Sequence, residues 1–123
     1  MSDPPGLRLT LLRHGRAETQ AAGQADYDRA LDRRGIAEVA GMARRWLELG
    51  RRPDELRASA ALRTRQTADT FARELGLPPD ALRFERALYL ADPATLIGSI
   101  RATDARVRHL MLVGHNPGLA DLV

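Results

Sequence analysis

Short apolar segments alternate with segments of helical periodicity along this chain, and this alternation restricts the fold more than any other feature. Extended segments are expected over residues 7–12, 55–59, 82–85 and 107–113. The apolar residues with helical spacing are Ile36, Val39, Ala40, Ala43 and Leu47, then Ala68, Phe71, Ala72 and Leu75, then Leu96, Ile97 and Ile100, and a fourth helix is expected after Asn116 and Pro117. This order predicts a three-layer α/β/α fold with a mostly parallel central sheet.

The length of 123 residues is typical of one domain, so we expect a single domain over residues 1–123. No apolar run approaches the roughly 20 residues that span a bilayer. Residues 1–5 also lack the pattern of a signal peptide, and we therefore expect a cytoplasmic protein without a membrane partner. The chain has no cysteine, which excludes disulfides, thiolate nucleophiles and zinc sites that use sulfur.

The basic residues are unusual, because all 19 are arginine. Against 16 acidic residues they leave a formal charge of +3. Acidic and basic residues are interleaved, as in residues 26–34 and 44–52, so we expect most arginines on solvated helix faces and no nucleic-acid partner. One alternative remains open, a non-catalytic arginine-rich module that binds phosphate or another polyanion.

Two of the three histidines occupy equivalent places in the sequence. His14 and His115 each follow the carboxyl end of an expected strand, and Gly15 and Gly114 flank them. In open α/β sheets ligands bind at the carboxyl ends of the strands, and glycine lets the backbone approach a ligand closely. Adjacent strands would bring both imidazoles into one crevice. We expect the third histidine, His109, to be structural or exposed, because it stands at a strand start.

Two arginines accompany these histidines. Arg13 precedes His14, and Arg63 lies in the first turn of the second expected helix. A helix N-terminus and a guanidinium both favour phosphate, so the set predicts a phosphoryl site. A metal site is a poorer interpretation, because no carboxylate stands at ligand spacing beside either histidine. No metal or other cofactor is therefore expected.

Four stretches carry a resemblance to a known family. They are Arg13-His14-Gly15 after two leucines, residues 30–35, residues 58–68, and Val113-Gly114-His115-Asn116-Pro117-Gly118. In this order they resemble the histidine phosphatase superfamily, whose fold is that of phosphoglycerate mutase. The small size and the Gly-His-Asn-Pro ending are most similar to the phosphohistidine phosphatase (SixA-type) branch. Members usually continue for several tens of residues after the second histidine, so this chain looks shortened at its C-terminus.

The resemblance implies a role for each residue of the expected site. His14 is the nucleophile, while Arg13, Arg63 and His115 hold the phosphoryl oxygens beside Gly15. A neutral imidazole can attack phosphorus near pH 7, and fixed positive groups stabilise the transition state without Mg²⁺. The expected function is a metal-independent phosphatase acting on phosphohistidine in a protein. A small-molecule phosphatase or mutase of the same superfamily is the alternative, with a small phosphorylated substrate as its partner.

The general acid is the remaining role. A phosphate ester needs its leaving oxygen protonated, and Glu85 stands where related enzymes place a carboxylic acid. Glu18 and Asp92 are weaker candidates. The competing interpretation of Glu85 is a surface residue paired with Arg83 or Arg86. The P–N bond of phosphohistidine needs less help from an acid, so a site without one would favour that substrate.

Overall fold

The computed structural model describes residues 6–123, so residues 1–5, for which no signal peptide is expected, lie outside the described part of the chain. The strands are β1 (Arg8–Arg13), β2 (Glu55–Ser59), β3 (Leu82–Glu85) and β4 (His109–Gly114). The α-helices are α1 (Arg33–Glu48), α2 (Leu62–Leu75), α3 (Pro93–Arg101) and α4 (Gly118–Leu122), and 3₁₀ turns occur at η1 (Asp26–Asp28), η2 (Pro79–Ala81) and η3 (Arg86–Leu88).

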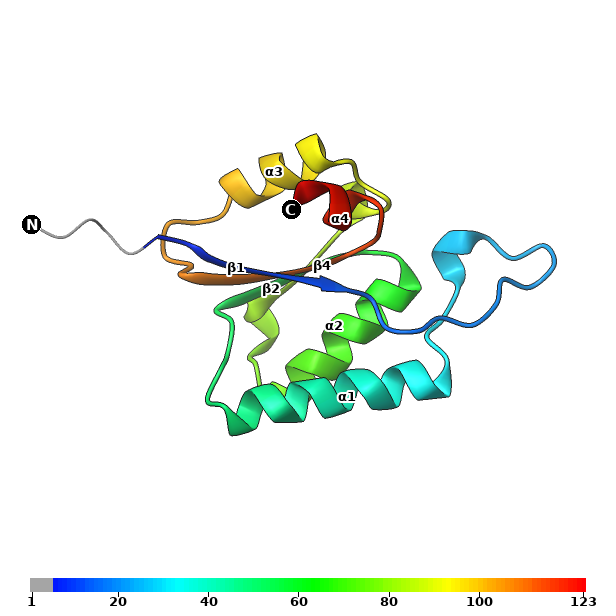
Figure 1. Ribbon diagram of the computed structural model, residues 1–123, viewed down its shortest axis with the longest axis horizontal. Helices are drawn as coiled ribbons and strands as arrows, with labels where there is room; N and C mark the ends of the chain where they lie inside the picture. The colour runs from blue at the N-terminus through cyan, green and yellow to red at the C-terminus, as the bar shows by residue number, and fades with distance from the viewer. Residues whose placement is uncertain (1–5) are drawn as a thin grey trace, which may run out of the picture.

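The four strands form one parallel sheet in the order β1-β4-β2-β3. Helices α1 and α2 cover one face of this sheet, and α3 and α4 cover the other (Figure 1). The expected three-layer α/β/α architecture with a parallel central sheet is therefore confirmed. In the pairing of β1 with β4, Arg8 lies opposite His109 and Arg13 lies opposite Gly114. The carboxyl ends of these two strands consequently finish side by side.

Local signals explain where the helices begin and end. The Asp32 side chain accepts a hydrogen bond of 2.6 Å from the backbone N–H of Gly35 and so caps α1. Asp92 caps α3 in the same way, with Pro93 in the first helical position. Helix α2 ends at Gly76, which has a φ of 66° that favours glycine. The two capping aspartates, Pro93 and Gly76 thus mark these helix limits.

The core has two parts, one on each face of the sheet. Phe71 and Val39 belong to the part under α1 and α2, and the Trp46 ring packs edge-on against Phe71 with centroids 5.3 Å apart. The other part, under α3 and α4, contains Leu88, Leu96, Leu112 and Leu119. Each large apolar side chain buried in this way stabilises the fold by about 1.5–3 kcal/mol. Trp46 and Phe71 are therefore core residues, as expected.

Two element limits differ from the expectation. Strand β4 begins at His109 rather than Val107, because the backbone N–H of Val107 bonds to Asp104 in a turn. Helix α4 begins at Gly118, and Asn116 joins Pro117 by a cis peptide bond. The Asn116 side chain still contacts the start of helix α4, because its Oδ1 accepts a hydrogen bond from the Ala120 N–H. Within residues 6–123, no helix has the length and apolar character needed to cross a membrane.

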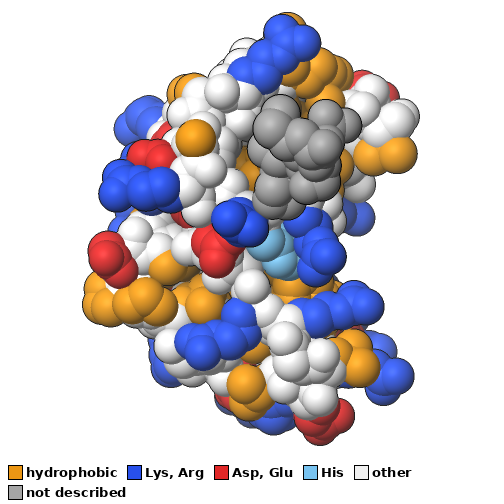
Figure 2. Space-filling view, turned by 90° about the vertical axis from the view of Figure 1, so that its left-hand side faces the viewer, with side chains coloured by type: hydrophobic (Ala, Val, Ile, Leu, Met, Phe, Trp, Pro, Cys, Tyr) orange, Lys and Arg blue, Asp and Glu red, His pale blue; other side chains and the backbone are white. Residues whose placement is uncertain are grey.

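Charged side chains of both signs mix on the surface at the amino ends of the strands. Figure 2 views the molecule from this side, and arginines alternate there with acidic side chains and apolar patches. His109 lies at this end, where Thr10 Oγ1 and His109 Nε2 are 2.8 Å apart and the Trp46 ring stacks on the imidazole. This histidine has a structural role, far from the carboxyl ends of β1 and β4.

Candidate active site

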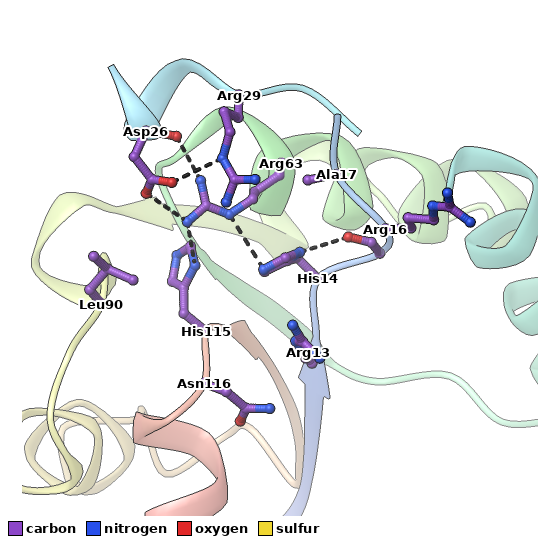
Figure 3. Close-up of a pocket in the computed structure, with 11 residues that line it drawn as sticks. Arg13, His14, Arg16, Ala17, Asp26, Arg29, Arg63, Leu90, His115 and Asn116 are labelled. Atoms are coloured by element: carbon purple, nitrogen blue, oxygen red, sulfur yellow. Dashed lines mark hydrogen bonds and ion pairs between the residues drawn. The ribbon is translucent and has the colours of Figure 1, made fainter. Parts of the chain in front are cut away.

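A pocket of about 710 Å³ opens at the carboxyl ends of β1 and β4. The pocket-lining residues come mainly from the loops after these strands, from η1 and its surroundings, and from the start of α2 (Figure 3). They are Arg13, His14, Gly15, Arg16, Ala17, Asp26, Arg29, Arg63, Leu90, His115 and Asn116. Arg13, His14, Gly15, Arg63 and His115 were expected from the sequence, and the structure brings all five to this pocket.

His14 is held in one orientation by its Nδ1 atom. Nδ1 lies 2.7 Å from the carbonyl oxygen of Gly15, which can only accept a hydrogen bond. The proton is therefore on Nδ1, and Nε2 carries the lone pair, 3.3 Å from Nε of Arg63. Burial lowers the pKa of His14, the hydrogen bond to Gly15 opposes this shift, and the charges of Arg63 and Arg13 lower the pKa further. A neutral imidazole whose Nε2 lone pair faces the pocket and accepts from Arg63 suits a nucleophile.

Arg63 stands between the two histidines and is only 2% exposed. Its Nε faces His14 Nε2, and its Nη2 lies 3.3 Å from Nδ1 of His115. Since a guanidinium only donates, Nδ1 of His115 accepts, and Nε2 of His115 donates to Ser59 Oγ at 2.8 Å. The two imidazole centroids are 5.5 Å apart. One edge of the Arg63 guanidinium thus faces both rings.

Positive charge and burial keep His115 neutral. Burial, together with the charges of Arg63 and His14, lowers the pKa of His115 to about 4. His115 therefore enters the pocket as an uncharged hydrogen-bonding group near pH 7. The arginines Arg13 and Arg29 add positive charge to the pocket lining. The whole arrangement suits an oxyanion, because guanidinium groups converge on it from several directions.

Close packing around position 15 requires a glycine there. A Cβ atom built on Gly15 would lie 2.9 Å from Val39 Cγ2, a distance that real side chains do not tolerate. The N–H of Gly15 donates to Thr67 Oγ1 at 3.0 Å, and its carbonyl accepts from His14. Gly15 thereby anchors the loop that presents His14.

The structure does not bring Glu85 to the pocket. Its carboxylate lies 3.5 Å from Ser99 Oγ and 3.8 Å from Nε of Arg57, under helix α3. The partner is thus Arg57, where the competing interpretation named Arg83 or Arg86. The other candidate acids, Glu18 and Asp92, are also outside the lining. The backbone carbonyl of Glu18 accepts from Arg29, and the Asp92 side chain caps α3. Their placement does not support a role as general acid.

The carboxylate that does line the pocket among residues 6–123 is Asp26, which the sequence analysis did not single out. Its Oδ2 accepts hydrogen bonds from Tyr89 at 2.6 Å and from Nη2 of Arg63 at 3.0 Å, and its Oδ1 accepts from Arg29 at 2.9 Å. The hydrogen bond from Tyr89, followed by those from Arg63 and Arg29, lowers the pKa of Asp26 to about 2. Asp26 is therefore ionised near pH 7.

The sequence contains one signal for the contact between Asp26 and Arg29. Asp26 and Arg29 are three residues apart in a polar segment, and they form an ion pair across the η1 turn. The spacing alone could not show that Arg63 and Tyr89, 37 and 63 residues further along, contact the same carboxylate. Within residues 6–123, no group of three or more His, Cys, Asp or Glu residues is placed to hold a metal ion.

A family model described as histidine phosphatase superfamily (branch 1) matches residues 9–84, which contain His14 and Arg63. The chain belongs to the histidine phosphatase superfamily. An uncharacterized protein of Mycobacterium tuberculosis is 40% identical over 96 residues, which are 77% of this chain and 57% of that relative. The chain thus spans just over half the length of this relative.

Two solved structures confirm the expected similarity to the SixA type and to its fold. A structure from Agrobacterium tumefaciens, assigned as a phosphohistidine phosphatase SixA, has 34% sequence identity and a TM-score of 0.86, and the match covers 94% of this chain and 73% of that chain. The protein histidine phosphatase SixA in complex with tungstate has 25% identity and a TM-score of 0.82, with 93% of this chain and 72% of that chain covered.

Proposed function

We propose that this histidine phosphatase acts through a phosphohistidine intermediate on His14 and dephosphorylates phosphohistidine in a protein. The observation that supports this most strongly is the orientation of His14. Its Nδ1 proton is held by the carbonyl of Gly15, and its Nε2 lone pair faces the pocket beside Arg63. A nucleophile in this state needs no separate base to remove a proton before it attacks.

The reaction has two steps. His14 Nε2 attacks phosphorus and the P–N bond of the substrate breaks. The leaving imidazole takes the bonding electron pair and departs neutral, because its second ring nitrogen already carries a proton taken from solvent. Water then attacks the phosphoryl group on His14, which releases inorganic phosphate and returns the imidazole to its neutral form. Arg63, Arg13 and His115 are proposed to bind the three phosphoryl oxygens and to stabilise the charge that spreads over them in each transition state.

The carboxylates near the pocket favour a P–N bond in the substrate. Asp26 is ionised and engaged by Tyr89, Arg63 and Arg29, so it has no proton to give a leaving oxygen. Glu85 lies elsewhere. The imidazole of a phosphohistidine substrate leaves with less assistance than an alkoxide, because its ring nitrogen takes a proton readily near pH 7. The site therefore fits phosphohistidine better than a phosphate ester.

Exposed side chains in the pocket lining support a protein as the substrate. Arg13 is exposed, and the exposed Leu90 adds an apolar side chain to the lining. The segment 17–29 is short and leaves the crevice accessible to another protein surface. The description of one similar structure as a protein histidine phosphatase agrees with this proposal.

A small phosphorylated molecule is the alternative substrate, because the lining arginines would bind any phosphate. An assay of a phosphorylated histidine-containing protein domain beside a panel of sugar and nucleotide phosphates separates the two. We expect kcat/KM for the phosphorylated domain to exceed the values for the panel by at least about tenfold, which corresponds to about 1.4 kcal/mol of transition-state stabilisation. A higher kcat/KM for one of the small esters would overturn the assignment of a protein substrate.

A further inference from the structure

The Arg63 guanidinium uses two different edges for two different sets of partners. The edge formed by Nε and Nη2 faces His14 and His115, with both distances 3.3 Å. The edge formed by Nη1 and Nη2 faces Asp26, where Nη1 donates to the backbone carbonyl at 2.7 Å and Nη2 donates to Oδ2 at 3.0 Å (Figure 3). Two parallel contacts of this kind determine the plane of a guanidinium as well as its position.

Asp26 is itself held in place on both carboxylate oxygens. The Tyr89 hydroxyl donates to Oδ2 at 2.6 Å, and Nε of Arg29 donates to Oδ1 at 2.9 Å. The Tyr89 ring packs edge-on against Tyr27, with centroids 4.9 Å apart, and against His115, with centroids 5.4 Å apart. The carboxylate can therefore rotate little, and Arg63 is fixed through it to η1 and to Tyr89, which follows η3.

We propose that Asp26 is a positioning residue, which aims the Nε/Nη2 edge of Arg63 at the phosphoryl group between His14 and His115. This inference rests on the proposed function of His14. Asp26 engages Nη1 and one N–H of Nη2, so the N–H groups that face His14 and His115 are the ones left to turn from the imidazoles to the phosphoryl oxygens. A phosphoryl group that leaves the substrate and joins His14 would meet a guanidinium already in the correct plane.

The negative charge of Asp26 gives this role a measurable signature. A carboxylate beside the main phosphate-binding cation opposes the binding of an anion in the ground state. The same carboxylate raises the rate of the chemical step by fixing Arg63, since preorganised donors stabilise a transition state without reorganising. Removing the charge should therefore affect anion affinity and turnover in opposite directions. A residue needed only for folding would lower both.

The test compares the wild type with Asp26→Asn, and Asp28→Asn is the matched control in the same 3₁₀ turn, where the side chain is exposed. The probes are inorganic phosphate for affinity, measured by calorimetry, and p-nitrophenyl phosphate for turnover. We expect Asp26→Asn to lower kcat by about 10²-fold and to tighten phosphate binding. Asp28→Asn should leave both values at the wild-type level.

Tyr89→Phe provides a second variant, because it removes the hydroxyl that orients Asp26 but keeps the ring. It should lower kcat by less than Asp26→Asn without weakening phosphate binding, and it carries the test if Asp26→Asn does not fold. Parallel losses of kcat and phosphate affinity, or no loss of kcat, would overturn the proposal. Because both probes are small, these results do not depend on phosphohistidine, so a failure of the protein substrate is distinguished from a failure of the Asp26 role.

Discussion

The Nδ1 atom of His14 and the carbonyl oxygen of the adjacent Gly15 are 2.7 Å apart, and this contact sets the tautomer of the imidazole. The lone pair on Nε2 then faces Arg63 and the open pocket. Every prediction about turnover depends on this orientation, because the proposed covalent step begins at Nε2.

The first prediction concerns the nucleophile. His14→Ala should abolish the phosphoenzyme and lower turnover by several orders of magnitude, because no neighbouring side chain can replace Nε2. Labelled substrate followed by denaturing quench should give an adduct that is labile to acid and stable to base in the wild type. His109→Ala is the control, since this histidine lies at the amino end of β4. An adduct that persists in His14→Ala would falsify the assignment.

The second prediction separates a specific phosphate contact from general positive charge. Arg63→Ala should lower kcat/KM by about 10²- to 10³-fold, whereas Arg65→Ala should change it little. Both residues lie in the first turns of α2, but Arg63 is buried between the histidines and Arg65 is exposed over the Phe84 ring. Steady-state kinetics at equal ionic strength provide the comparison, with thermal unfolding as a check on folding. Equal losses would show that position 63 has no special function.

The third prediction concerns stability and pH. Burial, with the charges of Arg63 and His14, lowers the pKa of His115 from 6.5 to about 4 in the folded protein. As the pH falls from 6.5 towards 4, His115 binds a proton in the unfolded chain but not in the folded chain. The free energy of unfolding therefore decreases through this window. Protonation of His115 in the unfolded chain should lower the free energy of unfolding by about 2 kcal/mol between pH 7 and pH 5.

Urea denaturation at both pH values measures this loss, and His115→Gln, which cannot titrate, is the comparison. The variant should lose less stability than the wild type over the same interval. Identical losses in the two proteins would mean that His115 is not the residue responsible.

The fourth prediction concerns metals. Arg13, Arg63 and Arg29 give the pocket a positive charge that disfavours a divalent cation, although Asp26 offsets part of it. Activity should survive EDTA and should be inhibited by vanadate, which adopts the five-coordinate geometry of phosphoryl transfer at His14. Complete loss of activity in EDTA, with recovery on adding a divalent metal, would contradict the proposed mechanism.

The fifth prediction uses two glycines of helix α1. A Cβ on Gly35 would lie 2.2 Å from the carbonyl oxygen of Arg16, which lines the pocket, whereas a Cβ on Gly41 would meet nothing within 4 Å. Gly35→Ala should lower the free energy of unfolding by about 1–3 kcal/mol, and Gly41→Ala should raise it by up to about 1 kcal/mol. Chemical denaturation distinguishes the two. Effects of the same sign would show that the helix does not pack this closely on the loop.

The sequence predicted the sheet and the two histidines because apolar runs and glycines mark strand ends directly. β1 and β4 are short apolar segments, and His14 and His115 follow them. We could therefore infer from the sequence that both histidines lie at the same edge of the sheet. The order of the strands needed the structure, because sequence spacing does not show that the last strand lies beside the first.

The site residues that were not expected from the sequence lie outside the segments with a periodic apolar pattern. Asp26 and Arg29 lie in a polar segment without periodicity, and Tyr89 follows a short 3₁₀ turn. Their contact depends on the fold of the whole chain rather than on local spacing. Glu85 is the opposite case: the strand that ends at Glu85 was expected from the sequence, but the buried Arg57 and the half-buried Ser99, which sequence spacing does not show, lie beside its carboxylate.

The position of β4 between β1 and β2 has a consequence for the newly made protein. Arg8 and His109 are paired in the sheet although about 100 residues separate them, and contacts of such separation form slowly because a long loop must close first. A nascent chain that has not yet reached residue 109 contains His14 but lacks both β4 and His115. The proposed phosphoryl site is therefore incomplete until β4 has been made and has paired with β1 and β2.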